Sequence, residues 1–309
     1  MLASVFRKST PINYTLIVII VLLMFFLYQI QDLTWTLSYI EIGKKIGILA
    51  LIFGTLFFIN FIVKKNILTR DSVYTVYFFI LLLLFFPSAI NNWKLLFANF
   101  FIILSMRRLI SLQTLKAPKE KIFDATLWIL VASLLHFWCI LFLFLVYISI
   151  IFNVSRDYRN WLIPIVALLA FGNLFLLYAL AFDEKLLSNI THNFTYNFEV
   201  DYFQNKYQNI AFSSYVVAVL FFVISAIFSL SSRPLNLQGS YKKIIFAFII
   251  AIVIFILSPQ KGNEILLFTF FPLAVMMTNF VEYSQNKINQ EMVLYVTTFV
   301  ALFNYFMQL

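Results

Sequence analysis

Residues 122–152 read IFDATLWILVASLLHFWCILFLFLVYISIIF and contain neither Lys nor Arg. A helix needs about 20 apolar residues to cross the roughly 30 Å of hydrocarbon in a bilayer. The stretch is long for one crossing and short for two. It is therefore either one long tilted helix or two short helices that turn near His136. The choice matters for the whole fold, because one more crossing moves every later loop to the other side of the membrane.

The composition of the chain places it in a lipid environment. Of its 309 residues, 63% are hydrophobic and 11% are charged, whereas a soluble domain has about 45–50% apolar and about 25% charged residues. The mean hydropathy is +0.94. These values exclude a soluble enzyme, a disordered chain and a coiled coil. Cys139 is the one cysteine, so an internal disulfide is excluded as well.

Segmentation at charged and turn-forming residues predicts eleven membrane spans. We expect them at Tyr14–Ile30, Ile46–Val63, Val73–Ile90, Leu95–Leu109, Ile122–Leu135, Phe137–Phe152, Trp161–Phe182, Ala211–Leu230, Ile244–Ser258, Ile265–Val281 and Met292–Leu309. The fifth and sixth of these spans correspond to the two-helix interpretation of residues 122–152.

The distribution of Lys and Arg favours the two-helix interpretation, because cytoplasmic loops of membrane proteins carry an excess of basic residues. With a cytoplasmic N-terminus and eleven spans, 16 of the 22 basic residues lie on the cytoplasmic side: Arg7, Lys8, Lys64, Lys65, Arg70, Arg107, Arg108, Lys116, Lys119, Lys121, Arg156, Arg159, Arg233, Lys242, Lys243 and Lys287. The outer side keeps Lys44, Lys45, Lys94, Lys185, Lys206 and Lys261. One long helix would instead move Arg156 and all later basic residues to the opposite face.

We therefore predict an all-α polytopic membrane protein with about eleven transmembrane helices, a cytoplasmic N-terminus and an extracytoplasmic C-terminus. Residues 1–309 form a single integral membrane domain. The net charge of +9 then reflects orientation in the bilayer and does not indicate a nucleic-acid partner.

In this topology the first outer segment carries two carboxylates. The outer interfacial loop, residues 31–45, reads QDLTWTLSYIEIGKK and holds Asp32 and Glu41. Its mixture of apolar, aromatic and charged residues is typical of an amphipathic helix in the interface, which would hold a carboxylate near the lipid headgroups. The alternative is an ordinary interfacial belt, where Trp and Tyr are common.

Two later outer segments are also polar. The long outer loop, residues 183–210, holds Glu199 and Asp201 and is long enough for a lid or a substrate-binding loop. The short connection that contains Lys261 and Glu264 joins two strongly apolar spans. It is either a simple tight turn or a place where a Lys pairs with a lipid phosphate.

His136 has two interpretations. An ionisable residue at membrane depth is a functional hypothesis by default, but a His beside Trp138 at an interface is also an ordinary feature. The chain has two His and one Cys, and zinc sites take three or four such ligands, so we predict no metal site. No Walker, GxSxG or HExxH motif and no regular series of Arg within a span is present, which argues against P-loop ATPases, zinc proteases and voltage sensors.

A resemblance extends over about 70 residues in the first half of the chain. The stretch resembles parts of polyprenyl-phosphate-sugar-dependent (GT-C type) glycosyltransferases and of O-antigen and exopolysaccharide polymerases, through Phe86-Pro-Ser, Leu95–Met106, Arg107-Arg108, the basic loop to Lys121 and the short hairpin with His136. The whole chain also resembles an uncharacterised multi-pass inner-membrane family of Bacteroidetes-type bacteria. This second resemblance implies a location in the bacterial inner membrane.

The glycosyltransferase resemblance implies roles for several residues. Asp32 or Glu41 would match the carboxylate of the first outer loop, which acts as a general base, and Lys94 or Lys261 would neutralise the leaving phosphate. The first loop lacks the paired acids of the family, and the nearest match is Glu199-Val-Asp201 in a later loop. The resemblance thus gives Asp32 and Glu41 as catalytic residues, and Lys94, His136, Glu199, Asp201, Lys261 and Glu264 as substrate-binding residues. It implies no cofactor other than a bound polyprenyl-phosphate lipid.

Three function hypotheses follow. The first is a lipid-linked-sugar glycosyltransferase or glycan polymerase that acts at the outer face and has membrane lipids as its partners. The second is a non-catalytic subunit of an envelope, secretion or motility complex, which the scarcity of charge within the spans favours, with other membrane subunits as partners. The third is a transporter or flippase.

Overall fold

The computed structural model describes residues 2–31, 33–182, 206–259, 261–284 and 286–309. Within these ranges the chain is helical and contains no β-strand. After a short N-terminal helix, α1 (Leu2–Phe6), the long helices are α2 (Pro11–Gln29), α3 (Tyr39–Lys65), α4 (Tyr74–Phe85), α5 (Trp93–Ile110), α6 (Pro118–Leu135), α7 (Leu143–Asn153), α8 (Arg159–Phe182), α10 (Lys206–Ser229), α11 (Leu235–Leu257), α12 (Leu267–Tyr283) and α13 (Lys287–Gln308).

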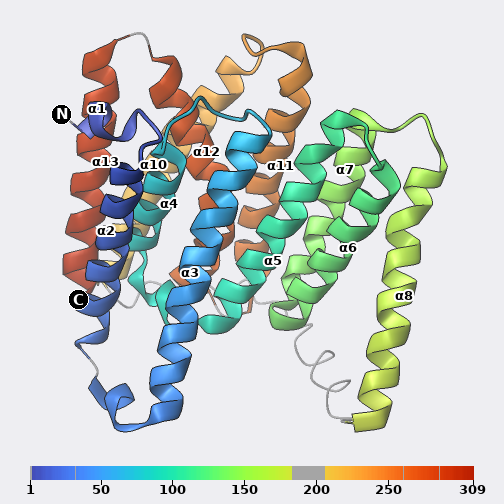
Figure 1. The fold of residues 1–309 in the computed structure, drawn as a ribbon, viewed down its shortest axis with the longest axis horizontal. Coiled ribbons are helices and arrows are strands. Elements are labelled where there is room, and N and C mark those ends of the chain that lie inside the picture. The colour runs from blue at the N-terminus through green and yellow to red at the C-terminus, as the bar shows by residue number, and fades with distance from the viewer. Residues whose placement is uncertain (1, 32, 183–205, 260, 285) are drawn as a thin grey trace.

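Successive long helices run in alternating directions, side by side, as Figure 1 shows. Within the described residues, each predicted span overlaps one of these helices. Seven helical segments are long and apolar enough to cross a membrane: Pro11–Gln29, Tyr39–Lys65, Trp93–Thr114, Arg159–Phe182, Lys206–Ser229, Leu235–Leu257 and Asn263–Tyr283. The predicted all-α polytopic class agrees with these findings. The number of eleven crossings and the orientation stay predictions.

The break in residues 122–152 lies at His136. Helix α6 ends at Leu135, and His136 has an extended backbone with φ −141° and ψ 105°. A 3₁₀ segment, η4 (Phe137–Phe142), then leads into α7 and buries Cys139 and Phe142 in the core. The two-helix interpretation is therefore confirmed, and the single long helix is wrong.

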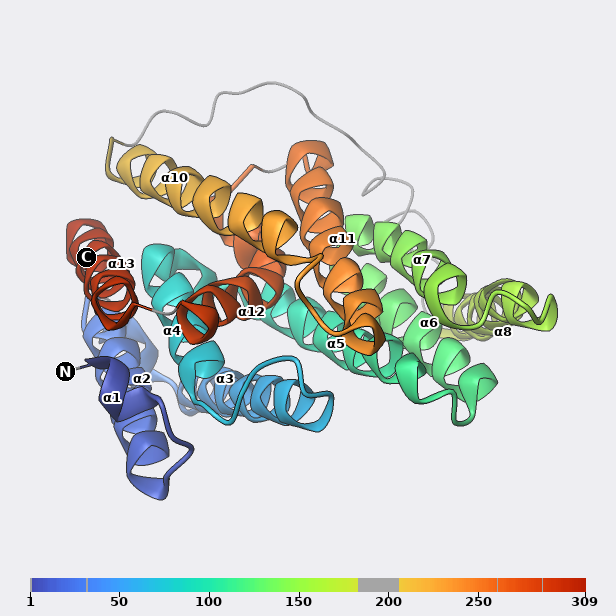
Figure 2. The same cartoon turned by 90° about the horizontal axis from the view of Figure 1, so that it is seen from above.

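The core of the bundle lies around α4 and α12. All residues of α4 are buried, and α12 is buried along nearly its whole length. Seen from above, both helices lie inside a ring formed by α2, α3, α5, α10, α11 and α13 (Figure 2). Helices that are hydrophobic on all sides are found in such interior positions. Phe79, Phe86, Tyr215 and Phe270 meet there, with ring centroids 5.3–6.4 Å apart.

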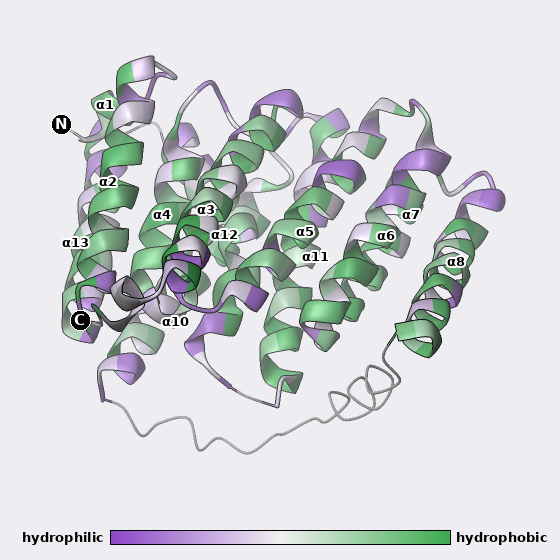
Figure 3. Cartoon of the chain, turned by 60° about the horizontal axis from the view of Figure 1, so that its bottom comes forward, coloured by the Kyte–Doolittle hydropathy of each residue, from purple (hydrophilic) through white to green (hydrophobic). Residues whose placement is uncertain are grey.

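The peripheral helices expose apolar surface. In the most apolar 18-residue stretch of each helix, only 11% of α8 and 17% of α10 is buried inside the molecule. Helix α8 packs on α6 and α7 at one edge of the bundle. Hydrophobic residues extend along the helices, whereas hydrophilic residues gather at the helix ends and connections (Figure 3). This arrangement fits a protein whose sides contact lipid.

The alternation of the helices gives the bundle two different ends. One end, which we call the basic end, holds α1, the connections 66–73, 111–117, 154–158 and 230–234, and residues 284 and 286. Contacts between distant segments join them there, such as the hydrogen bond from Tyr241 Oη to the Leu68 carbonyl at 2.6 Å. The other end, which we call the C-terminal end, holds Leu309, the connections 86–92 and 136–142, and the described residues 30–31, 33–38, 258–259 and 261–266. The residues predicted to be cytoplasmic lie at the basic end.

Candidate functional site

A polar cleft of about 240 Å³ lies at the C-terminal end. Its walls come from the end of α2, the 3₁₀ segment η1 (Leu33–Leu37), the start of α3 and the connection after η2 (Pro87–Ile90). The described residues that line it are Tyr28, Gln29, Gln31, Trp35, Glu41, Lys45 and Asn91. Most of them carry polar side-chain groups, which distinguishes this site from the apolar surroundings of the bundle.

Asn91 connects the two sides of the cleft. Its Oδ1 atom accepts hydrogen bonds from Gln29 Nε2 at 3.0 Å and from Lys45 Nζ at 2.8 Å. The Trp35 indole donates to the Gln29 carbonyl at 3.2 Å, and Gln31 Nε2 donates to the carbonyl of Leu309. These contacts hold the interfacial loop against the connection between α4 and α5, so the cleft has defined walls.

Glu41 is the catalytic candidate that the structure places in this cleft. It lies in the first turn of α3, where the helix dipole favours a negative charge. One carboxylate oxygen pairs with Lys44 Nζ at 2.5 Å, and 43% of the side chain is exposed. A half-exposed carboxylate in a polar cleft is accessible to a hydroxyl group of a ligand.

Glu264 lies beside the same site. It is part of η6 (Asn263–Leu266), and its Oε2 atom accepts a hydrogen bond from Asn92 Nδ2 at 2.7 Å. Asn92 also caps α5, since its Oδ1 accepts from the backbone N–H of Leu95. Tyr28 lines the cleft and lies within electrostatic range of Glu264. The adjacent residues Asn91 and Asn92 thus link the cleft that contains Glu41 to Glu264: Asn91 lines the cleft, and Asn92 binds Glu264.

His136 occupies a separate position at the C-terminal end. Its Nε2 atom lies 3.5 Å from Ser258 Oγ, and its ring centroid lies 5.6 Å from that of Phe268. Burial lowers the pKa of His136 to about 4, so the imidazole is neutral at physiological pH. Within the described part of the chain, His136 does not line the cleft. It contacts Ser258 at the start of the connection between α11 and α12, and Glu264 lies near the end of that connection.

The remaining predicted site residues are not brought into the cleft by the described structure. Lys94 lies with its Nζ 5.8 Å from the centroid of the Trp93 ring, and Lys261 is half-buried in the connection between α11 and α12. Neither lines the cleft among the described residues. Asp32, Glu199 and Asp201 lie outside the residues that the structure describes.

Sequence reasoning missed seven of the contributing residues as site residues: Tyr28, Gln29, Gln31, Trp35, Lys45, Asn91 and Asn92. The Asn-Asn pair is visible as a polar interruption between two apolar spans. The sequence does not show the hydrogen-bond partners of this pair, because Gln29, Lys45 and Glu264 come from three other places in the chain.

The chemistry available in the cleft is that of polar recognition. Glu41 accepts hydrogen bonds or a proton, Lys45 offers positive charge, and Gln29 and Asn91 offer amide groups. The Trp35 indole supplies an aromatic surface with one polar atom. In the described residues no group of three or more His, Cys, Asp or Glu could hold a metal ion. This set suits a ligand with several hydroxyl groups and an anionic group.

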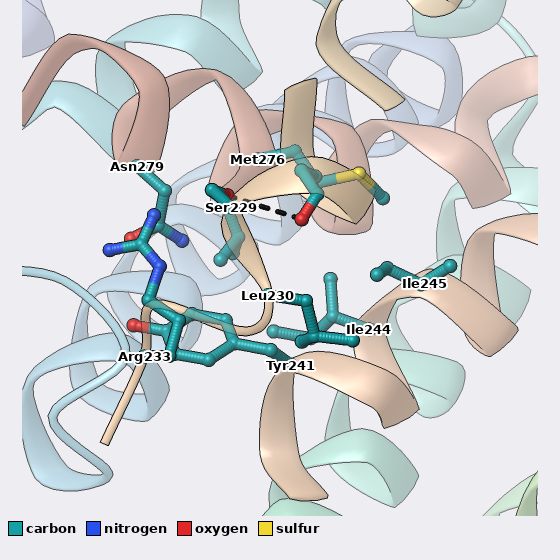
Figure 4. A pocket seen from close by; sticks show the side chains of 10 residues that line it. Ser229, Leu230, Arg233, Tyr241, Ile244, Ile245, Met276 and Asn279 are labelled. Carbon is teal, nitrogen blue, oxygen red and sulfur yellow. Dashed lines mark hydrogen bonds between the residues drawn. The ribbon is translucent and has the colours of Figure 1, made fainter. Parts of the chain in front are cut away.

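A second cavity, at the basic end, is much smaller. It measures about 20 Å³ and is lined mainly by apolar side chains of α10, α11 and α12, with Arg233 and Asn279 at one side (Figure 4). Arg233 Nη1 and Asn279 Oδ1 have no hydrogen-bond partner among the described residues. The volume suits about one water molecule. It is too small for a lipid headgroup or a sugar.

No protein-family model, no curated protein and no solved structure matches this chain. The residues and their geometry are therefore the basis for assigning a function.

Proposed function

We propose that the chain is an inner-membrane protein that binds a polyprenyl-phosphate-linked sugar in the cleft at its C-terminal end, as a glycosyltransferase or glycan polymerase. The observation that supports this proposal is the cleft itself, which combines Glu41, Lys45, Trp35 and two amide side chains at the end of membrane-length helices. A lipid-linked sugar has the matching groups: a chain that stays in the bilayer, a phosphate at its edge and sugar hydroxyls beyond it.

The proposed reaction uses two residues of the cleft. An acceptor hydroxyl oxygen forms a bond to the anomeric carbon of the donor sugar while the bond from that carbon to the phosphate oxygen breaks. Glu41 takes the proton of the hydroxyl as general base. Lys45 stabilises the negative charge on the leaving polyprenyl phosphate. Lys45 takes this role in place of Lys94 and Lys261 because it lines the cleft in the described structure.

The role of Glu41 is tested by Glu41→Gln. This change keeps the shape of the side chain but removes its basicity, and general-base catalysis contributes about 10²–10⁴-fold. We expect sugar transfer from undecaprenyl-phosphate-linked hexose, measured with purified protein in vesicles, to fall by at least about 100-fold. Glu120→Gln is the matched control, because Glu120 is also exposed in the first turn of a helix but lies on α6 at the basic end. Wild-type transfer by Glu41→Gln would refute the assigned role.

The finer topology belongs to the same proposal: eleven crossings, with the basic end in the cytoplasm and the cleft at the outer face. The excess of Lys and Arg at one end supports this orientation. We expect alkaline phosphatase, which is active only outside the cytoplasm, to be active when fused after Leu309 and inactive when fused after Ser155. Activity at Ser155 and none at Leu309 would contradict the orientation, and equal activity at both positions would contradict the number of crossings between them.

A second candidate function is a non-catalytic subunit of an envelope, secretion or motility complex. It is supported by the exposed apolar faces of α8 and α10. Only 11% of the apolar stretch of α8 and 17% of that of α10 is buried within this chain. Purification in mild detergent followed by quantitative mass spectrometry separates the two candidates. Partner proteins at a fixed stoichiometry support the subunit, whereas an isolated chain with bound polyprenyl phosphate supports the transferase.

A further inference from the structure

Four basic side chains from different elements gather at the basic end. Lys65 ends α3, Arg107 lies in the last turn of α5, Lys116 lies in the connection 111–117, and Lys121 lies near the start of α6. Lys65 Nζ lies 5.1 Å, and Arg107 Cζ 4.8 Å, from the centroid of one ring, that of Phe61. Lys121 lies within electrostatic range of Lys65 and Lys116. We name Lys65, Arg107, Lys116 and Lys121 the basic cluster.

The positive charge of the basic cluster is not neutralised within the described residues. Asp124, the nearby acid on α6, forms an ion pair with Arg108 at 2.8 Å. Glu120, also on α6, forms no ion pair among the described residues, and neither does any of the four cations. Close like charges repel one another, and the low dielectric near a membrane strengthens that repulsion. An anion between them would remove it.

The basic cluster is held by specific contacts. Lys121 Nζ donates to the Ser111 carbonyl at 2.8 Å and to Thr114 Oγ1 at 2.9 Å. Lys243, which is fully buried on α11, donates to the Leu109 carbonyl at 2.6 Å. These bonds cap the carbonyl end of α5 and fix the connection that carries Lys116. Lys116 therefore lies in an anchored connection, and the other three cations lie on the ends of the helices around it.

Strained backbone borders the same cluster. The described residues contain three non-glycine residues with positive φ: Ile67 at 55°, Leu115 at 55° and Ala117 at 44°. Ile67 follows Lys65 by two positions, and Leu115 and Ala117 flank Lys116. Positive φ is costly for residues with a Cβ atom, and most of all for a β-branched one. Such strain gathers at sites where a ligand is held. Among the described residues it occurs only in the connection 66–73, which directly follows Lys65, and in the connection 111–117, which contains Lys116.

We propose that the basic cluster binds the headgroup of an anionic lipid with two phosphate groups. A lipid is the expected source because α3 and α5 both have the length and apolarity of membrane spans, so Lys65 and Arg107 lie at their ends, at headgroup depth. Phe61 lies one turn further into α3 and provides an apolar contact for the start of an acyl chain. Four cations around one site match the charge of two phosphates better than that of one. The proposal is independent of the cleft at the opposite end.

The test measures binding of tetraoleoyl cardiolipin, a lipid with two phosphates, to the purified full-length chain in detergent. Each cation near an anionic headgroup contributes about fivefold in affinity. We expect the triple variant Lys65→Gln, Arg107→Gln, Lys121→Gln to bind about 100-fold more weakly. Because Lys121 also anchors the connection, a second variant, Lys65→Gln with Lys116→Gln, changes only exposed side chains and should bind about 25-fold more weakly.

Two comparisons make the outcome decisive. The control variant Lys8→Gln with Lys287→Gln removes two exposed cations, as many as the variant at Lys65 and Lys116, at the same end but outside the basic cluster. It should bind cardiolipin like the wild type. An equal loss in control and cluster variants would overturn the site, because it would show a general attraction to basic residues. Dioleoylphosphatidylcholine should not compete. Inorganic pyrophosphate that displaces cardiolipin at equal concentration would overturn the lipid as the source of the phosphates.

Discussion

Replacement of Glu282 by Ala should destabilise the protein by about 3–5 kcal/mol, the usual cost of removing one partner from a buried charged network. Glu282 is 8% exposed on α12. Its carboxylate accepts hydrogen bonds from the backbone N–H of Arg70 at 2.8 Å and from the Ser72 hydroxyl. The change therefore leaves both donors without this acceptor and releases the connection 66–73 from α12.

A buried cation also lies near this carboxylate. Arg233 is 6% exposed, lies 3.5 Å above the Tyr283 ring, and is within electrostatic range of Glu282. Glu282→Ala would also remove the negative charge near that guanidinium, which adds to the loss.

The measurement is the free energy of unfolding in mixed detergent micelles. Glu282→Gln keeps an acceptor oxygen, so it should lower the free energy of unfolding clearly less than Glu282→Ala. Glu120→Ala, at an exposed site, should change the value by no more than about 0.5 kcal/mol. If Glu282→Ala and Glu120→Ala had the same effect, Glu282 would have no part in holding the basic end together.

Replacement of Phe270 by Ala should cost about 3–5 kcal/mol, as is usual for loss of a fully buried aromatic side chain. Phe270 is 0% exposed on α12. Its ring centroid lies 6.2 Å from those of Phe79 and Phe86, and 6.4 Å from that of Tyr215. These partners come from α4, from the residue that follows α4, and from α10. The change would leave a cavity where three parts of the chain meet.

The matched control for this prediction is Phe228→Ala, because Phe228 is 79% exposed on α10. Its loss should leave the free energy of unfolding within about 0.5 kcal/mol of the wild type. Phe270→Leu fills part of the cavity and should lie between Phe270→Ala and the wild type. A loss of less than about 1 kcal/mol for Phe270→Ala would show that the core closes around the gap.

The helices and the break at His136 could be predicted from the sequence because they depend on local properties. A membrane helix must be apolar over about 20 residues whatever surrounds it, so composition alone marks the segments. The break follows from charge, since one helix over residues 122–152 would have placed Arg156 and Arg159 on the wrong side. The structure confirms it with an extended backbone at His136.

The candidate site could be predicted only in part. Glu41 was expected at the outer end of the bundle, and the structure places it in a polar cleft. Lys94 and Lys261 were expected to share that site, and within the described residues they do not line it. In a chain with so many similar apolar helices, a loop position shows at which end a residue lies but not which other loops lie beside it.

The sequence alone thus establishes a helical membrane chain with one strongly basic end, because hydrophobicity and charge act on each segment separately. Tertiary structure decides which polar groups meet: Asn91 with Gln29 and Lys45, Asn92 with Glu264, and the cations that share Phe61. Such contacts depend on how helices pack against one another. Helices that are apolar on all sides, such as α4 and α12, contain little pattern from which that packing could be read. Residues 122–152 show both contributions. The charge distribution in the sequence predicts the turn near His136, and tertiary packing buries Cys139 and Phe142 of that turn in the core.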